Sequence, residues 1–390
     1  MIKAILWRLK NLGFFLLGLV YLAIYGSRKN AVLPGKIVVV QGAKLGDMVC
    51  TTPVFRAIKK AYPNCRVVVV GDSVNQKLLA GHPDIDRYII WNKNFFETAK
   101  EIEKENAEYG ILMLPSLEGL ALLIASKIPS ISASIIDGGS SPYETKTYRL
   151  LSRFIIQKPH YFDHYVPREY LRLLEPINIF TEDTTKNLSF TKSAEGKINN
   201  LFIKNGVDGK KDFLVGILPG VGGDPIKRWA PEKFARLADY LAGKHKAKIF
   251  ILGAGRDKDE AEKTLAGLSP NTTVINLFDK LSIDELKALI ASLSLFISAD
   301  TGPIYIAEAF STPTIDILGP VKEFVQPPRS KFHKAVFAPR ERGMLGVLDN
   351  IAPDLAEAKR QTDGLAVETV TKIVDEIIPV IIGRQKAKII

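Results

Sequence analysis

Cysteine and histidine are scarce in this chain of 390 residues, which contains two cysteines and five histidines. Cys50 and Cys65 cannot form a disulfide framework, and they lack the paired spacing of a zinc site. His160 and His164 are four residues apart, but no Glu or third ligand accompanies them, so we do not expect them to bind zinc. The chain therefore suits a reducing compartment, and the sequence predicts no metal site.

Acidic residues are absent before Asp47, whereas basic residues are spread over this first segment. More basic residues close the chain, where Arg384, Lys386 and Lys388 lie. The formal charge is +11, from 53 Lys and Arg against 42 Asp and Glu. A basic surface binds nucleic acid or an anionic membrane. Because the sequence has no nucleic-acid-binding motif, we expect an anionic membrane surface as a partner and no nucleic acid.

An almost wholly apolar run, residues 12–25, lies inside this basic segment. It is shorter than the ~20 residues that cross a bilayer comfortably, and the segment lacks the small-x-small cleavage site of a secretory signal. Trp7, Tyr21 and Tyr25 favour the headgroup region. We therefore expect residues 1–30 to form a peripheral or monotopic segment that lies in the membrane surface. A helix packed on the protein's own core and a single tilted span are the alternatives.

The known phosphate-loop motifs are missing from the glycine loop that follows a β-branched run, residues 37–40. Gly42, Lys44 and Gly46 lie in this loop, but neither Gly-x-Gly-x-x-Gly nor a terminal Gly-Lys-Ser/Thr is present. Instead the loop ends in Asp47, where a helix begins, and the helix dipole stabilises a carboxylate at that place. Asp47 is therefore a candidate base for a neutral hydroxyl, although an Asp before a helix is more often only an N-cap.

Strand and helix patterns alternate in two halves of the chain, with a polar interruption between them. This alternation predicts an α/β fold of two Rossmann-like domains, with parallel sheets that face an interdomain cleft as the default ligand site. The expected strands are 37–40, 66–70, 87–90, 110–114 and 132–136, then 213–218, 248–252, 273–276, 295–298 and 314–318. The expected segments are a membrane-associating segment 1–30, a first domain 31–185, a linker 186–211, a second domain 212–350, and a C-terminal helix and basic tail 351–390. Residues 321–355 show no readable pattern.

Glycine-rich loops follow three of the strands expected in the second half. They contain Gly220, Gly222, Gly223 and, close behind, Lys227; then Gly253; and then Asp300, Thr301, Gly302 and Pro303. Glycine leaves backbone amides open to an anion, and a helix N-terminus attracts one. Each loop alone is a weak signal, because glycine turns after strands are common. Together with Lys227 they predict a nucleotide-diphosphate site.

Motifs in both halves are similar to those of one enzyme family. They are Gly42-x-x-x-Gly46-Asp47 with Thr51-Thr52-Pro53, then Lys227-Arg228-Trp229-Ala230-Pro231, Asp300-Thr301-Gly302-Pro303, Thr312-Pro313-Thr314 and Gly319-Pro320. In this combination the chain resembles glycosyltransferase family 9, the heptosyltransferases of lipopolysaccharide synthesis, over about residues 36–321. The resemblance implies a GT-B fold, in which two Rossmann-like domains share the substrates.

The resemblance also implies a reaction. It implies metal-independent, inverting transfer of a sugar, heptose or similar, from a nucleotide diphosphate donor, with ADP-heptose as one candidate. The acceptor would be a lipopolysaccharide core or another lipid-linked or cell-surface glycan. It implies that Asp47 is the catalytic base, that Lys227 contacts the donor phosphates, and that residues 300–302 line the donor site, with no cofactor besides the donor substrate. With residues 1–30, it implies a place on the cytoplasmic face of the inner membrane.

Some features depart from the family pattern. Many members carry Ser or Thr where this chain has Gly222 and Gly223, so phosphate binding here would rely on backbone amides. Members commonly have a Glu near the Gly253 loop that holds the nucleotide base, whereas this chain has Arg256. Asp316 lies inside an apolar strand, and the sequence gives no reason for it.

Two other functions remain open at this point. A nonhydrolysing nucleotide-sugar epimerase would share the fold but would need several acids and a histidine in the cleft, and this sequence offers few. A non-catalytic nucleotide-sugar-binding module would keep Lys227 and Asp300 but would have no need for Asp47. Release of nucleoside diphosphate with and without an acceptor separates the three.

Overall fold

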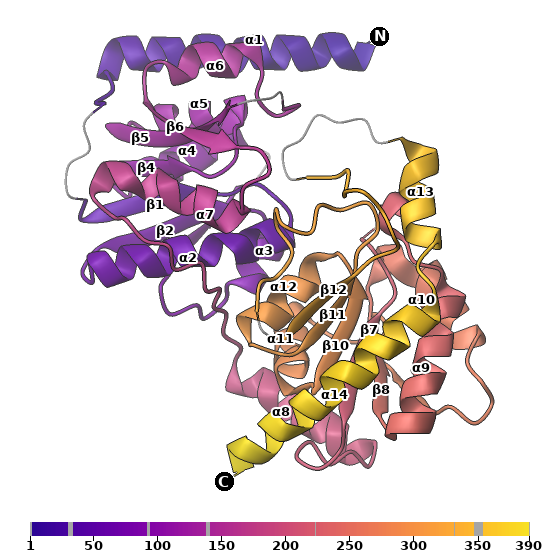
Figure 1. The fold of residues 1–390 in the computed structure, drawn as a ribbon. Coiled ribbons are helices and arrows are strands. Elements are labelled where there is room, and N and C mark those ends of the chain that lie inside the picture. Colours follow the sequence, from indigo (N-terminus) through magenta and orange to yellow (C-terminus); the bar gives the residue numbers. More distant parts are fainter. Residues whose placement is uncertain are drawn as a thin grey trace. The chain divides into compact units, whose positions relative to one another are not determined.

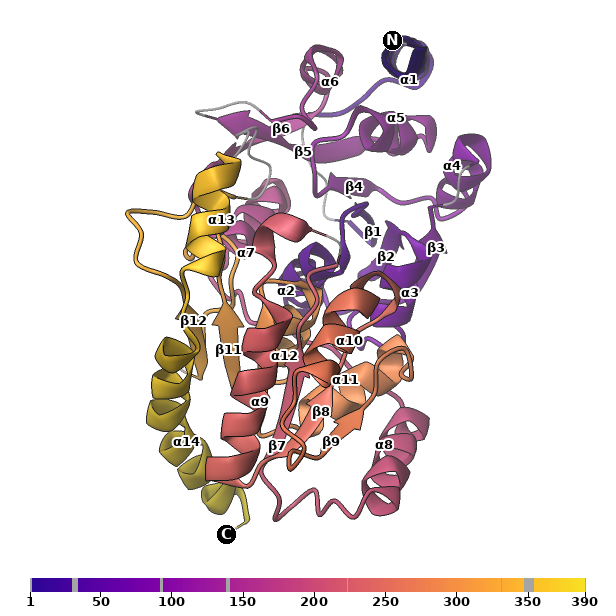
Figure 2. The same ribbon diagram turned by 90° about the vertical axis from the view of Figure 1, so that its right-hand side faces the viewer.

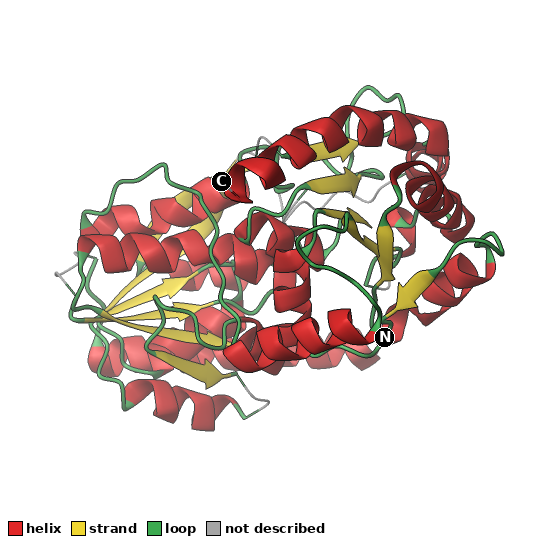
Figure 3. Ribbon diagram, turned by 90° about the horizontal axis from the view of Figure 1, so that it is seen from below, coloured by secondary structure: helices red, strands yellow, loops and turns green. Residues whose placement is uncertain are grey.

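The computed structural model describes residues 2–29, 34–91, 94–137, 141–222, 224–330, 332–346 and 354–389 (Figure 1). The chain divides into two compact units, with the described residues up to Asn187 in the N-terminal unit and those from Leu188 onward in the C-terminal unit. Each unit contains a six-stranded parallel sheet with helices packed on its faces (Figure 3). The expectation of an α/β fold with two Rossmann-like domains is therefore confirmed.

The N-terminal sheet has the strand order β3-β2-β1-β4-β5-β6. Its strands are β1 (Lys36–Val40), β2 (Arg66–Gly71), β3 (Arg87–Ile90), β4 (Tyr109–Leu112), β5 (Ser130–Asp137) and β6 (Ile156–Tyr161). The central strands β1 and β2 are runs of Val and Ile that are buried on both faces, as expected for a covered parallel sheet. The sequence pattern misses β6, because Pro159 and His160 interrupt its apolar residues at the edge of the sheet.

A helix follows each of these strands. They are α2 (Leu45–Ala61), α3 (Ser73–Leu78), α4 (Phe95–Glu103), α5 (Leu117–Ala125), α6 (Lys146–Ser152) and α7 (Val166–Leu171), followed by the 3₁₀ turn η1 (Arg172–Ile177). The side chains of Asp72, Asn94, Ser116 and Thr145 accept a backbone hydrogen bond at the starts of α3, α4, α5 and α6. Such caps satisfy amides that would lack a partner within the helix, so they fix where each helix leaves the sheet.

Helix α1 (Ile2–Tyr25) lies along α5 and α6 (Figures 1 and 2). One side of it, with Phe14, Phe15, Leu17, Leu19, Tyr21 and Leu22, packs on the core of the N-terminal unit. Gly18 permits this approach, since a Cβ there would lie 2.7 Å from Leu151 Cδ2. Another side exposes a stripe made of Ile5, Leu9, Leu12, Leu16, Val20 and Ile24. The alternative of a core-packed helix is therefore right for one side only. Within the described ranges, the stretch Ile5–Tyr25 is long and apolar enough to cross a membrane.

The C-terminal sheet has the order β12-β11-β10-β7-β8-β9. Its strands are β7 (Leu214–Leu218), β8 (Lys248–Ile251), β9 (Val274–Asn276), β10 (Leu295–Ala299), β11 (Thr314–Ile317) and β12 (His333–Val336). Its helices are α9 (Pro231–His245), α10 (Lys258–Ala266), α11 (Ile283–Ser292), α12 (Gly302–Ala309) and α14 (Val367–Ile389), with 3₁₀ turns η2 (Pro225–Lys227) and η3 (Gly255–Asp257). Helices α9 and α14 pack side by side over one apolar face of the sheet (Figure 2). Read from β9, the strand order matches that of the N-terminal sheet, so the two units share one topology.

Two stretches differ from the expected organisation. Residues 186–211, expected to be a linker, contain helix α8 (Lys192–Lys204), which packs on α11. Its composition is polar because the described helix buries little besides Ala194, Ile198 and Phe202, on one side. The stretch 321–355, which has no readable pattern, contains β12, and α13 (Leu355–Asp363) begins at its end.

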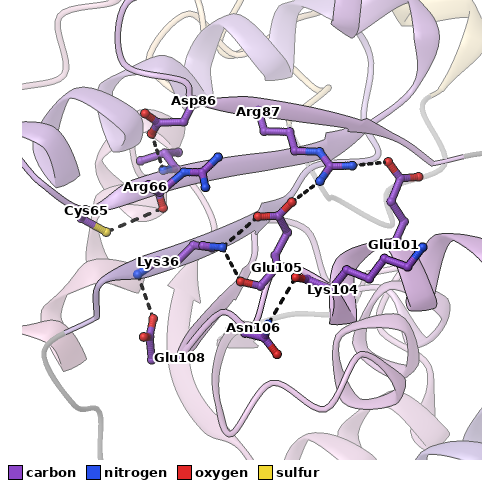
Figure 4. A network of polar contacts seen from close by, with 11 residues as sticks. Lys36, Cys65, Arg66, Asp86, Arg87, Glu101, Lys104, Glu105, Asn106 and Glu108 are labelled. Atoms are coloured by element: carbon purple, nitrogen blue, oxygen red, sulfur yellow. Dashed lines mark hydrogen bonds and ion pairs between the residues drawn. The ribbon is translucent and has the colours of Figure 1, made fainter.

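An ion-pair network lies at the amino ends of β1 and β3 (Figure 4). Glu105 Oε2 is 3.0 Å from Lys36 Nζ, and the other carboxylate oxygen pairs with Arg87, which also lies 2.8 Å from Glu101. Burial raises the pKa of Glu105, but Lys36 and Arg87 lower it by more, so Glu105 is ionised at neutral pH. Ion pairs therefore stabilise this end of the sheet. Ligands of α/β sheets bind at the opposite, carboxyl ends of the strands, so this network has a structural role.

Candidate active site

The loop after β1 places Asp47 in the first turn of α2. Helix α2 begins at Leu45, so Asp47 is its third residue, and Lys44 is the N-cap, whose side chain makes no capping hydrogen bond. The alternative that Asp47 is the N-cap is therefore wrong. Asp47 is half-buried, Gly46 is buried, and Gly42 and Lys44 are exposed. A negative charge is favourable at the start of a helix, which suits a residue that must accept a proton.

Two buried polar side chains that the motifs do not include hold this loop. Gln41 Oε1 accepts a hydrogen bond from the Ala43 amide at 3.3 Å, and Gln41 Nε2 donates to Thr51 Oγ1 at 2.9 Å. Thr51 Oγ1 in turn donates to the backbone carbonyl of Asp47 at 2.9 Å. Asn75 Nδ2, from α3, donates to the Ala43 carbonyl at 2.9 Å. The sequence contains one signal of this role, because Gln41 is a polar residue directly after an all-apolar strand.

Aromatic side chains border the same loop. A Cβ on Gly42 would lie 3.3 Å from Cζ3 of Trp91, the residue that follows β3, so the ring packs closely against this glycine. Tyr170, from α7, is fully buried near Asp47. Burial first, and the Asp47 carboxylate second, raise the pKa of Tyr170 well above its usual value. The phenol is therefore protonated, and it adds no negative charge next to the candidate base.

In the C-terminal unit, the first and second glycine loops are joined by a residue that the sequence motifs omit, Asp257. Its Oδ1 accepts a hydrogen bond from the Gly222 amide at 2.9 Å, and a Cβ on Gly220 would overlap it, at 2.1 Å from Asp257 Cγ. The expectation that the Gly220 and Gly222 amides are open to a phosphate is therefore wrong for Gly222, whose amide is already bonded. Gly223 lies outside the described residues. Gly253 has a φ of 153°, and a Cβ there would lie 2.9 Å from Phe278, so packing explains this glycine.

Lys227 and the third loop come together as expected. Lys227 Nζ, at the end of η2, lies 2.6 Å from Asp300 Oδ2, and the Tyr305 hydroxyl donates to Asp300 Oδ1 at 2.9 Å. Thr301 is the N-cap of α12 but makes no side-chain cap, and Gly302 and Pro303 form the first turn. Burial lowers the pKa of Lys227, but the nearby carboxylates, led by that of Asp300, raise it by more. A cation is thus fixed beside a helix N-terminus, which is an anion-binding arrangement.

Asp316 lies under this cation, in β11. It pairs in register with Ser298 of β10, and both side chains are fully buried. Among the described residues, neither the Asp316 carboxylate oxygens nor Ser298 Oγ has a hydrogen-bond partner. Burial, and then the Asp300 carboxylate, raise the pKa of Asp316 well above its usual value, while Lys227 lowers it in part. Burial therefore favours the neutral, protonated form of the Asp316 carboxyl group, which explains how an apolar strand tolerates it.

Asp84 and Asp86, two acidic residues with one residue between them, and His164 have structural partners. Asp84 accepts a hydrogen bond from Asn187 at 3.0 Å, and Asp86 pairs with Lys59 at 2.7 Å. His164 Nδ1 lies 3.2 Å from Glu169. In the part of the chain that the structure describes, no group of three His, Cys, Asp or Glu side chains is placed to hold a metal ion.

Comparison with known proteins shows which family this chain belongs to. The model of glycosyltransferase family 9 (heptosyltransferase) matches residues 97–344, which is more than half of the chain. The chain belongs to glycosyltransferase family 9. This family 9 glycosyltransferase is 27% identical to lipooligosaccharide heptosyltransferase 2 of Campylobacter jejuni over 282 residues, covering 71% of this chain and 79% of the relative. It is 26% identical to lipopolysaccharide heptosyltransferase 3 of Escherichia coli K12 over 285 residues, covering 70% and 79%.

Solved structures agree on the fold of this family 9 glycosyltransferase. A glycosyl transferase family 9 structure from Veillonella parvula superposes with a TM-score of 0.71 at 20% identity, over 90% of this chain and 98% of that one. The structure of E. coli ADP-heptose lps heptosyltransferase II gives a TM-score of 0.67 at 17% identity, over 87% and 99%. The expected GT-B fold is confirmed, and so is the expectation that the protein is a glycosyltransferase.

Proposed function

We propose that this glycosyltransferase moves a heptose or a similar sugar from a nucleotide diphosphate donor to the lipopolysaccharide core or another lipid-linked glycan. The names of the relatives support this substrate class, because they are lipopolysaccharide and lipooligosaccharide heptosyltransferases. ADP-heptose is the first donor to test, since one structural neighbour is an ADP-heptose transferase. The observation that carries the proposal is the Lys227 ammonium, held by Asp300 at the N-terminus of α12.

In the proposed reaction, Asp47 removes the proton from an acceptor hydroxyl as its oxygen attacks the anomeric carbon of the donor sugar. The bond from that carbon to the diphosphate oxygen breaks, and the configuration inverts. The transition state resembles an oxocarbenium ion, as in glycoside hydrolysis. Lys227 and the amides at the start of α12 stabilise the charge that develops on the leaving diphosphate. Since these cationic and dipolar groups can neutralise the diphosphate, we propose that no divalent metal is required.

We also propose that α1 holds the enzyme on the cytoplasmic face of the inner membrane. Its exposed stripe of apolar side chains would enter the interfacial layer, and its other side is already packed on the N-terminal unit. A helix that packs along α5 and α6 cannot leave the unit to cross a bilayer without exposing Phe14, Phe15 and Leu17. The structure therefore favours an in-plane position over a span.

The test is Asp47→Asn, with Glu97→Gln as a matched control. Glu97 is the third residue of α4, so it is the same kind of charge at the same helix position in the same unit. Loss of a first-turn carboxylate typically costs ~0.3–1 kcal/mol of stability, and both variants should stay within that range. General-base catalysis contributes ~10²–10⁴-fold, so only Asp47→Asn should slow acceptor-dependent release of nucleoside diphosphate by 100-fold or more. Donor affinity should be unchanged.

The product's anomeric configuration, read by NMR, tests inversion separately. Asp47→Asn turnover within about tenfold of wild type, well short of the expected loss, would remove Asp47 as the base. Retention of configuration would contradict the single-displacement step.

A further inference from the structure

A small cavity of about 180 Å³ lies between α1 and the N-terminal unit, apart from the loops described above. Its walls come from three segments: Trp7, Lys10 and Phe14 of α1, the loop and first turn of α5 after β4, and the loop before α6 that contains Tyr143. It is smaller than the ~300–1,000 Å³ of a site that encloses a whole ligand. Its size fits one ring or headgroup of a larger molecule.

The cavity occupies a ligand-binding position of the fold. In the order β3-β2-β1-β4-β5-β6 the direction of winding changes between β1 and β4, and ligands of α/β sheets bind at the carboxyl ends of strands on either side of such a point. The Asp47 loop follows β1, and the α5 wall of the cavity, Ser116 to Glu118, follows β4. The Met113 amide donates to the Val40 carbonyl at 3.0 Å, so the two strands are still paired where these loops begin.

Trp91 connects the cavity wall to the Asp47 loop. A Cβ on Gly42 would lie 3.3 Å from the Trp91 ring, and a Cβ on Gly119, in the first turn of α5, would lie 3.4 Å from the same ring. The indole is therefore in contact with both the loop that carries the candidate base and the helix that lines the cavity. A molecule that occupies the cavity could reach Asp47 along this side of the N-terminal unit.

The lining is suited to a sugar ring. Trp7 and Tyr143 are aromatic side chains that are more than half exposed, an unusual position for such large apolar groups unless something covers them. Lys10 Nζ lies 2.7 Å from Glu118 Oε2, so a hydrogen-bond donor and an acceptor stand next to each other at the cavity. Neighbouring hydroxyls of a sugar both donate and accept, and they can bond to such a pair while the ring face covers an aromatic side chain.

The same helix also supplies the apolar stripe proposed to enter the membrane. Leu9, Leu12 and Leu16 of that stripe alternate along α1 with Trp7, Lys10 and Phe14 of the cavity. A glycan attached to a membrane lipid emerges at the level where α1 would lie. A cavity beside this helix is therefore placed to receive a sugar close to the lipid end of such a molecule.

We propose that this cavity is an acceptor subsite, which binds one sugar ring of a membrane-anchored glycan through Lys10, Glu118 and Tyr143. The proposal rests on the proposed function, because it assigns part of the substrate of that reaction. It gives α1 a second task besides attachment to the membrane, since Lys10 contacts the acceptor and Trp7 and Phe14 line the cavity. The rest of the acceptor extends past Trp91 toward Asp47.

The experiment uses the full chain in detergent micelles and, as a probe, deacylated lipooligosaccharide core oligosaccharide. Binding of the probe is measured by calorimetry without donor, and transfer is measured with ADP-heptose. The variants are Glu118→Gln and Tyr143→Ala, neither of which changes α1. The controls are Glu97→Gln, an exposed acid on α4, and Phe154→Ala, an exposed aromatic residue outside the cavity.

Each cavity variant should weaken binding of the probe about tenfold, as expected for the loss of one good polar or stacking contact. The KM for the donor and partitioning to anionic vesicles should not change, and the controls should behave as wild type. The Lys10–Glu118 pair is exposed and contributes little to stability, so Glu118→Gln should fold normally.

The outcomes test the acceptor subsite separately from the proposed reaction. If the cavity variants bind the probe as tightly as the controls, or if the wild type does not bind it, the subsite is refuted, whatever the transfer activity. If the wild type binds the probe and both cavity variants lose it, but no sugar is transferred, the subsite is supported and the proposed reaction is refuted.

Discussion

The contact between Lys227 and Asp300 can be separated into a part that stabilises the fold and a part that binds the donor. Lys227→Met keeps the length of the side chain and removes its charge. In the wild type the two charged atoms are 2.6 Å apart, and the side chains are 23% and 6% exposed. Removal of one partner from a buried pair costs ~3–5 kcal/mol. Because Tyr305 still donates to Asp300 at 2.9 Å, we expect a loss near the lower limit, about 3 kcal/mol.

The double variant Lys227→Met with Asp300→Asn should recover most of this stability, because no carboxylate is left without its cation. Donor affinity should not recover. A charge-assisted contact to phosphate is worth ~1.5–3 kcal/mol, or roughly 10- to 150-fold in Kd. The deciding comparison is therefore between the double variant and Asp300→Asn alone, since both lack the Asp300 charge and differ only in the cation.

Urea unfolding followed by circular dichroism gives the stabilities, and calorimetric titration with ADP-heptose gives the affinities. Lys197→Met is the control, because it breaks an equally short pair, 2.6 Å from Glu285, at a mostly exposed position of the same unit. It should cost under ~1 kcal/mol and leave donor affinity unchanged. If Asp300→Asn and the double variant bind the donor equally well, Lys227 serves only as the partner of Asp300, and its assignment to the phosphates is wrong.

Three further predictions concern the metal, the membrane and pH. Turnover should survive EDTA; a rate that vanishes in EDTA and returns with Mg²⁺ or Mn²⁺ would refute metal independence. Leu9→Ser with Leu16→Ser should weaken sedimentation with anionic vesicles roughly thirtyfold, at about 1 kcal/mol for each half-exposed leucine, whereas unchanged sedimentation would place the membrane contact elsewhere. Burial, with His164 and Arg172, lowers the pKa of His160 from 6.5 to about 4. The unfolded chain therefore gains a proton between these values and the folded chain does not. The contribution of His160 to stability should be constant above pH 6.5 and fall toward pH 4 by up to roughly 3 kcal/mol, and His160→Phe should remove this contribution to the slope in urea titrations.

The elements that sequence predicts well are those whose own residues decide their structure. The valine and isoleucine runs of β1 and β2 are stable only as strands that are buried on both faces, and both form such strands. The structures of strand β6 and helix α8 depend instead on contacts with neighbouring elements. An edge strand with Pro159 needs only one paired side, and α8 needs only Ala194, Ile198 and Phe202 to dock on α11, so neither has a strong pattern of its own.

The candidate site is likewise predicted from sequence only where its residues are recognisable without knowledge of their neighbours in the fold. Sequence proposes Asp47, Lys227 and Asp300 as site residues, because charged residues beside strand ends are conspicuous in a parallel α/β pattern, and the structure places Lys227 beside Asp300. It does not find that Asp257, a residue of another loop, occupies the amide of Gly222. Competition for a backbone donor depends on distances between segments 35 residues apart in sequence, and no local pattern records it.

The shared strand order of the two sheets has a consequence for how this enzyme could change its substrates. Strands β1 and β7 hold equivalent positions, and so do β4 and β10. On the roles proposed above, the loops after β7 and β10 serve the donor, while those after β1 and β4 serve the acceptor and its base. Each substrate is thus bound by the loops that follow two equivalent strands, and the two pairs of loops belong to different sheets of the same topology. Substitutions in one pair of loops leave the other sheet and its loops intact, so donor and acceptor preferences can diverge independently.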